Sequence, residues 1–362
     1  MSANPVTYDA FLTRESMARI ARRRRRRERL GRGVVLVGTL VVLIGLLAFP
    51  LFLTASIASW TPLPAGAWAG LATLLAGTIK AAIAALAVAL PLGIGAAIWS
   101  AGFAAPRLRS WLKPCLEILE AIPTVVLGLV AMATLAPWLK TNVATLLALV
   151  VIIPALLLAG GFCFGARLRK RSGWLALWLL PVLLALTVAI VAAFANGRGD
   201  AIVPDSPWNA LLVGLALGLA AVPLVFSIAE DALMLIPATH VQSALALGAT
   251  RWQALMSIVL PAARSGLIAA IALGASRCLG ETMIVLMASG NTPVASVDPL
   301  AGLRTISAEL ALGLPEAAPA SGTYRALLLA ALSLFVLTLA LNLVAAHART
   351  RLYRRSAGVS SS

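Results

Sequence analysis

Residues 229–266 read AEDALMLIPATHVQSALALGATRWQALMSIVLPAARSG, and this stretch decides the fold. It is less hydrophobic than the apolar segments on either side of it. Its pattern predicts two short helices broken at Gly248, where glycine permits a sharp turn with positive φ. Leu245 before the break, and Trp252 and Met256 after it, would form an exposed apolar surface. An exposed apolar helix pair is typical of a surface on which another protein docks.

The composition of the chain indicates a membrane protein. Of its 362 residues, 61% are hydrophobic and only 12% are charged, whereas soluble domains carry about 25% charged residues. The mean hydropathy of +0.97 agrees with this. An ordinary soluble enzyme, a disordered chain and a secreted disulfide scaffold are therefore excluded. The three cysteines and two histidines lack the spacing of metal ligands, so we expect no metal site.

Eight apolar stretches are long enough to cross a bilayer, since a spanning helix needs about 20 mostly apolar residues. They are residues 34–57, 69–99, 115–137, 143–164, 174–195, 208–229, 265–289 and 324–346. The first stretch follows a basic N-terminus but is too long for the apolar core of a cleaved signal peptide. The sequence thus predicts an all-α, polytopic helical membrane protein with about eight spans.

The basic residues are distributed unevenly between alternate loops, which predicts the orientation. With the N-terminus inside, 23 of the 29 lysines and arginines fall on the inner side and four on the outer side. The positive-inside rule then places both termini and the loop 229–266 in the cytoplasm. We interpret the arginine run 22–27 as a topology determinant that also touches anionic lipid headgroups. No aromatic platform accompanies the run, so we expect no nucleic-acid partner.

The loop resembles the docking loop of permease subunits from ABC importers, which has the form EAA, three residues, Gly, nine residues, Ile-x-Leu-Pro. The spacing matches throughout, at Gln242, Ser243, Ala244, Gly248, Ile258, Leu260 and Pro261. By this resemblance these residues dock a separate ATPase. Gln242 departs from the usual Glu, which removes the carboxylate that a salt bridge at this position would need.

Three further segments resemble PstC-type phosphate permeases. They are SRCLGETMIVLMASGNTP at 276–293, LEILEAIPTVVLG at 116–128 and ISAELALGLPEA at 306–317. The other permease type of the same system, PstA, is the close alternative. The Glu-Thr-Met continuation and the following Gly-Asn favour the PstC type. The resemblance implies a type I ABC importer permease fold with six spans, to which this chain adds a hairpin at 143–195.

These features predict an order of segments along the chain. A basic cytoplasmic segment, 1–33, precedes the first three transmembrane helices, 34–137. An inserted transmembrane hairpin, 138–207, follows, which we interpret as lipid-facing. The permease core, 208–347, contains the docking loop, 230–264. A basic cytoplasmic tail, 348–362, ends the chain.

Charged residues inside predicted spans are the candidates for a substrate path. Arg277 and Glu281 are four residues apart, which would put them on one face of a continuous helix. They fall near the middle of a predicted span. Charges at that depth are costly and usually face a cavity or a partner helix. Arg277 would bind a tetrahedral oxyanion and Glu281 would orient it; the alternative is an ion pair that fixes helix packing. Lys80 either lines the path or extends to the interface.

Glu230 and Asp231 open the docking loop and would cap its helix.

No GxxxxGK[ST] P-loop is present, so we expect no bound ATP on this chain. No nucleophile–base set or metal-ligand grouping is present either, so we expect no cofactor and no catalytic residue. By resemblance, ATP and Mg²⁺ bind a PstB-like ATPase dimer. The other partners would be a PstA-like second permease, a PstS-like periplasmic phosphate-binding protein and the lipid of the bacterial inner membrane. The alternatives are an importer of sulfate, molybdate or a phosphonate, a stand-alone secondary transporter, and a membrane sensor derived from a permease.

Overall fold

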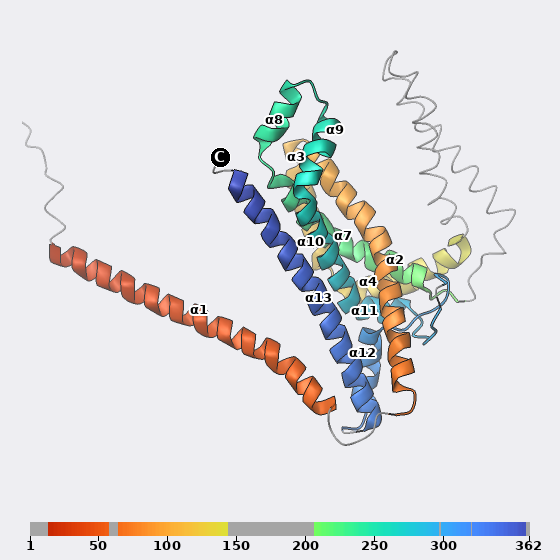
Figure 1. The fold of residues 1–362 in the computed structure, drawn as a ribbon. Helices are drawn as coiled ribbons and strands as arrows, with labels where there is room; N and C mark the ends of the chain where they lie inside the picture. Colours follow the sequence, from red (N-terminus) through yellow and green to blue (C-terminus); the bar gives the residue numbers. More distant parts are fainter. Residues whose placement is uncertain (1–13, 58–63, 144–205, 297, 320, 360–362) are drawn as a thin grey trace, which may run out of the picture. The chain divides into compact units, whose positions relative to one another are not determined.

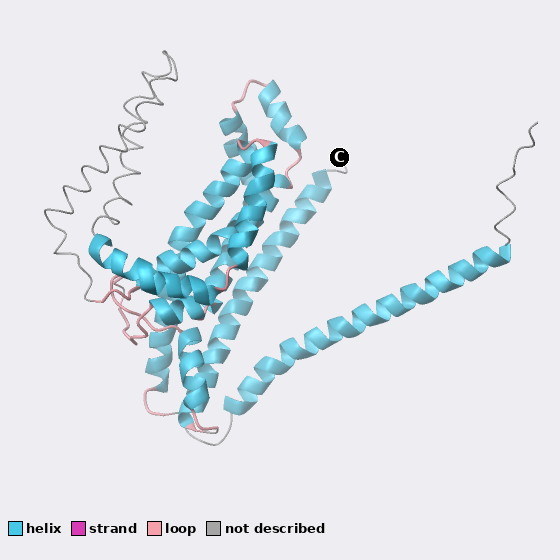
Figure 2. Ribbon diagram, turned by 180° about the vertical axis from the view of Figure 1, so that it is seen from behind, coloured by secondary structure: helices cyan, strands magenta, loops and turns pink. Residues whose placement is uncertain are grey.

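The computed structural model describes residues 14–57, 64–143, 206–296, 298–319 and 321–359. All regular secondary structure in these ranges is helical, which confirms the predicted all-α class (Figure 2). The chain forms two compact units, Met1–Trp60 and Thr61–Ser362.

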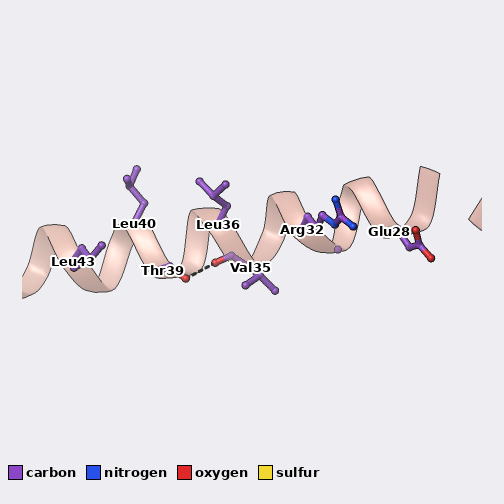
Figure 3. Close-up of a pocket in the computed structure, with 8 residues that line it drawn as sticks. Glu28, Arg32, Val35, Leu36, Thr39, Leu40 and Leu43 are labelled. Carbon is purple, nitrogen blue, oxygen red and sulfur yellow. Dashed lines mark hydrogen bonds between the residues drawn. The ribbon is translucent and has the colours of Figure 1, made fainter. Parts of the chain in front are cut away.

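The first unit contains the long helix α1, Arg14–Ile57. Its part Leu30–Ile57 is long and apolar enough to cross a membrane, and its most apolar stretch has no buried residue. Figure 3 shows one side of this helix, where a shallow hollow runs from Glu28 and Arg32 to Leu43. The hydroxyl of Thr39 is not free in this hollow, because it donates to the carbonyl of Val35 at 2.8 Å. The apolar side chains from Val34 to Phe49 are exposed, as those of a lipid-facing span would be, whereas Leu53 is buried.

In the second unit, α2 (Ala67–Gly102) and α7 (Ala210–Met234) form the central helix pair. Two glycines of α7, four residues apart, let the helices approach closely. A Cβ on Gly214 would lie 2.8 Å from the Cβ of Ala84, and one on Gly218 would lie 2.7 Å from the Cβ of Val88. The pair owes its close contact to these two missing side chains.

Two further long helices complete the bundle: α10 (Leu260–Gly280) packs against both α7 and α13 (Gly322–Val359). The short helices α8 (Ala238–Ala246) and α9 (Arg251–Ala254) lie at the same end of the bundle as the C-terminus of α13 (Figure 1). The short helix α12 (Ile306–Glu316) packs on α13 and lies toward the opposite end. The element expected to dock a partner therefore projects from one end of the bundle.

Six helices of the described residues meet the length and composition of a membrane span: Leu30–Ile57, Ala67–Gly102, Thr124–Val143, Ala210–Met234, Arg251–Gly280 and Gly322–Thr350. The predicted hairpin 143–195 lies outside the described residues except for Val143. Three predicted boundaries are wrong by nine residues or more, and one of them is the start of the seventh span, which lies at Arg251 instead of 265. The third span starts at Thr124 instead of 115, and the seventh ends at Gly280 instead of 289. These last two errors arise where a helix is interrupted, after Ala121 and after Gly280.

Candidate functional site

The first break separates α3 (Pro106–Ala121) from α4 (Thr124–Val130). Pro123 lacks a backbone N–H and disfavours helical geometry in the residue before it. Ile122 accordingly adopts an extended conformation, with φ −65° and ψ 128°. The helix restarts at Thr124 and continues through a π-helical segment, Ala131–Leu135, a feature that is frequent at functional sites. α3 thus is a separate helix and not the start of the span.

The second break separates α10 from α11 (Met283–Ala288). The helix ends at Gly280, and Glu281 is extended, with φ −72° and ψ 130°. The hydroxyl of Ser307 donates to the carbonyl of Glu281 at 2.8 Å, which holds this peptide outside the helix. The expectation that one continuous helix carries Arg277 and Glu281 is therefore wrong, because Glu281 occupies the C-cap position just after the helix that contains Arg277.

An ion pair joins the two breaks. Arg277 Nη1 lies 3.1 Å from Oε1 of Glu120, a residue in the last turn of α3, and the two side chains are 30% and 36% exposed. Just beyond the breaks α4 and α11 pack closely, because a Cβ on Gly128 would lie 3.0 Å from Met287 Sδ and 3.2 Å from Met283 O. The α3–α4 break and the α10–α11 break are thus linked by the ion pair between Arg277 and Glu120.

Lys80, the other cation inside a span, is placed elsewhere. Its Nζ donates over 3.5 Å to the carbonyl of Ala301. The chain around Ala301 lies directly on α2, since Thr78 Oγ1 accepts from the backbone N–H of Ile306 at 3.0 Å and the carbonyl of Arg304 occupies the space beside Gly77. The structure therefore associates Lys80 with this connecting loop and not with Arg277.

A second polar contact ties α3 to the end of α7. Glu230 is only 2% exposed; its Oε1 accepts from Ser100 Oγ at 2.5 Å and from Arg109 Nε at 3.0 Å. Beside it Lys113 donates to Asp231 at 3.0 Å, and this hydrogen bond raises the pKa of Lys113 above its ordinary value. Residues Glu230 and Asp231 belong to the end of α7, so the prediction that they cap the start of a docking-loop helix is wrong.

The turn between α8 and α9 confirms the predicted break at Gly248, whose φ is +89°. The backbone N–H of Gly248 donates to Leu245 O and that of Ala249 to Ala244 O, each at 3.0 Å. These two bonds form a Schellman motif. Thr250 then caps α9 in a capping box with Gln253. The hydrogen bonds of the Schellman motif and of the capping box therefore all lie within the segment 244–253.

The side chains of this turn divide into an anchored set and an exposed set. Trp252 lies over Phe103, with ring centroids 6.2 Å apart, and Leu255 is buried beside Gly102. Leu247 is 91% exposed at the tip. A hollow of about 490 Å³ opens between the turn and the ends of α2 and α7. An apolar tip on an anchored base suits insertion into another protein.

The residues expected to dock a partner lie in and after this turn. Gln242 and Ser243 are exposed and Ala244 is buried. Gln242 also lines the hollow, together with Arg251. Ile258 belongs to a π-helical segment, Leu255–Val259, that leads into α10, and Leu260 and Pro261 form the first turn of α10. In the ranges described, no three His, Cys, Asp or Glu side chains are grouped to hold a metal.

Comparison with known proteins supports this architecture. Residues 89–356 match the model of the family described as binding-protein-dependent transport system inner membrane component. The phosphate transport system permease protein PstC 1 of Mycobacterium tuberculosis is 30% identical over 297 residues, which cover 81% of this chain and 76% of that protein. The PstC protein of Xylella fastidiosa is 28% identical, and the match covers 79% of this chain and 75% of that protein. The PstC protein of Mesorhizobium japonicum is 29% identical, and the match covers 84% of this chain and 80% of that protein.

The family match spans both helix breaks, the docking turn and the last long helix. The helical architecture and the six candidate spans agree with a multi-pass permease. This chain therefore belongs to the binding-protein-dependent transport system inner membrane component family, as a permease of the PstC type.

Proposed function

We propose that this chain is the transmembrane permease subunit of an ATP-driven importer of inorganic phosphate. The observation that carries the proposal is the cation Arg277 beside two interrupted helices, paired to a partly exposed carboxylate. A guanidinium binds tetrahedral oxyanions through a planar fork of donors. The relatives named phosphate transport system permease proteins supply the identity of the oxyanion.

The exposed tip of the docking turn at Leu247 supports the following proposed transport cycle. ATP and Mg²⁺ bind a separate ATPase dimer, which engages the turn around Gly248. Its closure moves the turn, and the spans open alternately to the two sides of the inner membrane. A second permease subunit completes the path and a periplasmic binding protein delivers phosphate. The charge asymmetry of the loops supports an orientation with both termini in the cytoplasm.

The alternatives predict different partners and substrates. A secondary transporter would transport without a co-purifying ATPase, and the exposed turn at Gly248 argues against it. An importer of another oxyanion would assemble in the same way but would carry sulfate or molybdate. A sensor derived from a permease would bind the same partners without moving any substrate.

The test is uptake of labelled phosphate into proteoliposomes that contain the complete complex, ATP and the binding protein. The wild type should import phosphate, and Arg277→Gln should abolish uptake because it removes the charge and the fork. Arg277→Lys keeps the charge without the fork, so we expect at most partial uptake. Near-normal uptake by Arg277→Gln, with assembly intact, would reduce Arg277 to a structural ion pair.

A further inference from the structure

The pair Arg277–Glu120 offers both kinds of hydrogen-bonding group to an anion. A guanidinium only donates, whereas an ionised carboxylate only accepts. The recorded contact joins one nitrogen, Nη1, to one oxygen, Oε1. Among the described residues, the remaining donors of Arg277 and Oε2 of Glu120 are left for a ligand.

The surroundings leave room for such a ligand. Arg277 and Glu120 are each about one-third exposed. Gly280 is exposed in the turn that follows Arg277, and a Cβ on it would have no atom within 4 Å. The pair is thus partly open to its surroundings, and the space beside Gly280 at the α10–α11 break is free of packed atoms.

A carboxylate at this point makes the site sensitive to protonation of the ligand. Inorganic phosphate and arsenate keep at least one proton at neutral pH, so each has an O–H that can donate. Sulfate keeps none and presents acceptors alone. Next to Glu120 a sulfate oxygen would face a carboxylate oxygen with no hydrogen between them, and such an unpaired polar contact is costly away from water.

We propose that Glu120 is a specificity-determining residue that selects protonated tetrahedral oxyanions over sulfate. In this arrangement Arg277 donates to the charged oxygens of hydrogen phosphate, and Glu120 accepts from its hydroxyl. The inference rests on the proposed function and adds to it the reason for the choice of anion.

A purely structural role for the pair predicts a different result. If Glu120 only attached α3 to α10, its replacement by Gln would change stability but leave the order of anion affinities unchanged. α3 already has a separate attachment through Arg109 and Glu230 at its other end. The order of affinities is thus the measurement that a structural role would not move.

The experiment measures binding of labelled phosphate to the purified complex of both permeases and the ATPase, without the binding protein. Unlabelled phosphate, arsenate and sulfate compete at constant ionic strength and neutral pH. The signal that survives in Arg277→Gln is subtracted as background from other anion sites, including those of the ATPase. The variants are Glu120→Gln, Glu120→Asp and, as matched control, Glu117→Gln, because Glu117 is an exposed residue of the same helix.

In the wild type, phosphate and arsenate should compete at least about tenfold better than sulfate, since a site built for a ligand hydroxyl rejects analogues that lack it. Glu120→Gln offers an amide donor, so sulfate should compete within about threefold of phosphate. Glu120→Asp and Glu117→Gln should keep the wild-type order of affinities.

Three outcomes would overturn the inference: no Arg277-dependent binding in the wild type, an unchanged order in Glu120→Gln, or loss of all anion binding in that variant. Failure of the proposed function is distinct from these. It would appear as a wild-type complex that imports no phosphate in proteoliposomes.

Discussion

The neighbouring residues Glu230 and Asp231 show how burial changes the contribution of a carboxylate to the stability of the protein. Glu230 is buried and accepts from Ser100 and Arg109. The side chain of Asp231 is 63% exposed, and Lys113 is its ion-pair partner. Truncating one partner of a buried, hydrogen-bonded charge pair is strongly destabilising, whereas exposed ion pairs contribute little.

We expect Glu230→Gln to lower the stability of the purified protein by about 2–4 kcal/mol, because it leaves the charge of Arg109 without its counter-ion. Asp231→Asn should change stability by less than about 1 kcal/mol. Thermal unfolding in detergent compares the two. Equal shifts in the unfolding midpoint would mean that the burial of Glu230 has no energetic consequence.

At the same scale, the sequence revealed half of the candidate site. Arg277 is a charge within an apolar run, and its cost in a bilayer marks it without any structure. Its partner Glu120 is 157 residues away in the chain, and no local periodicity connects the two. The expected partner, Glu281, was chosen by helical spacing, which fails once the helix ends at Gly280.

Among the elements, the turn between α8 and α9 depends most on one residue. Gly248 is left-handed, with φ +89°, and a β-branched residue there would be strained by at least about 1–2 kcal/mol. We expect Gly248→Val to reach the membrane but to lose co-purification of the ATPase and substrate-stimulated ATP hydrolysis.

Gly248→Asn is the matched control, because Asn tolerates the left-handed region. It should retain ATPase binding and hydrolysis. Wild-type hydrolysis by Gly248→Val in the reconstituted complex would instead show that the docking assignment is wrong.

The close packing of α2 on α7 can be tested by adding a methyl group to a glycine inside the contact and to one outside it. Gly218→Ala places a methyl group 2.7 Å from Val88 Cβ, and overpacking of this kind costs about 1–3 kcal/mol. Gly95→Ala on α2 meets no atom within 4 Å and should be neutral or stabilising, since Ala favours helix over Gly by up to about 1 kcal/mol. In a thermal unfolding series, Gly218→Ala should lower the unfolding midpoint and Gly95→Ala should leave it unchanged or raise it. A drop caused by both would point to a general intolerance of substitution.

The elements themselves were largely predictable, but their interruptions were not. Long apolar runs predict α2, α7 and α13 well, because hydropathy is averaged over many residues. The same averaging conceals a break that occupies one or two residues. Pro123 carried a signal that could have placed the first break. The break at Glu281 depends on a hydrogen bond from Ser307, which only the folded chain supplies.

For the whole molecule, the uneven charge of the loops predicts that spans occur in even number between the two termini. Deleting residues 143–195 would remove two predicted spans and leave both termini on the same side. A reporter fused to the C-terminus should stay cytoplasmic in this variant, while a reporter after Val143 in the full chain should be periplasmic. Transfer of the C-terminal reporter to the periplasm would refute the count of eight.

The self-contained turn at Gly248 has a thermodynamic consequence for assembly. Its Schellman motif and capping box satisfy the backbone within the turn, and Trp252 and Leu255 hold its base against the end of α2. A protein that docks here meets a surface whose shape exists before the encounter. Little ordering entropy is then lost on association, so the complex can form at rates set by collision and orientation and not by folding of the loop.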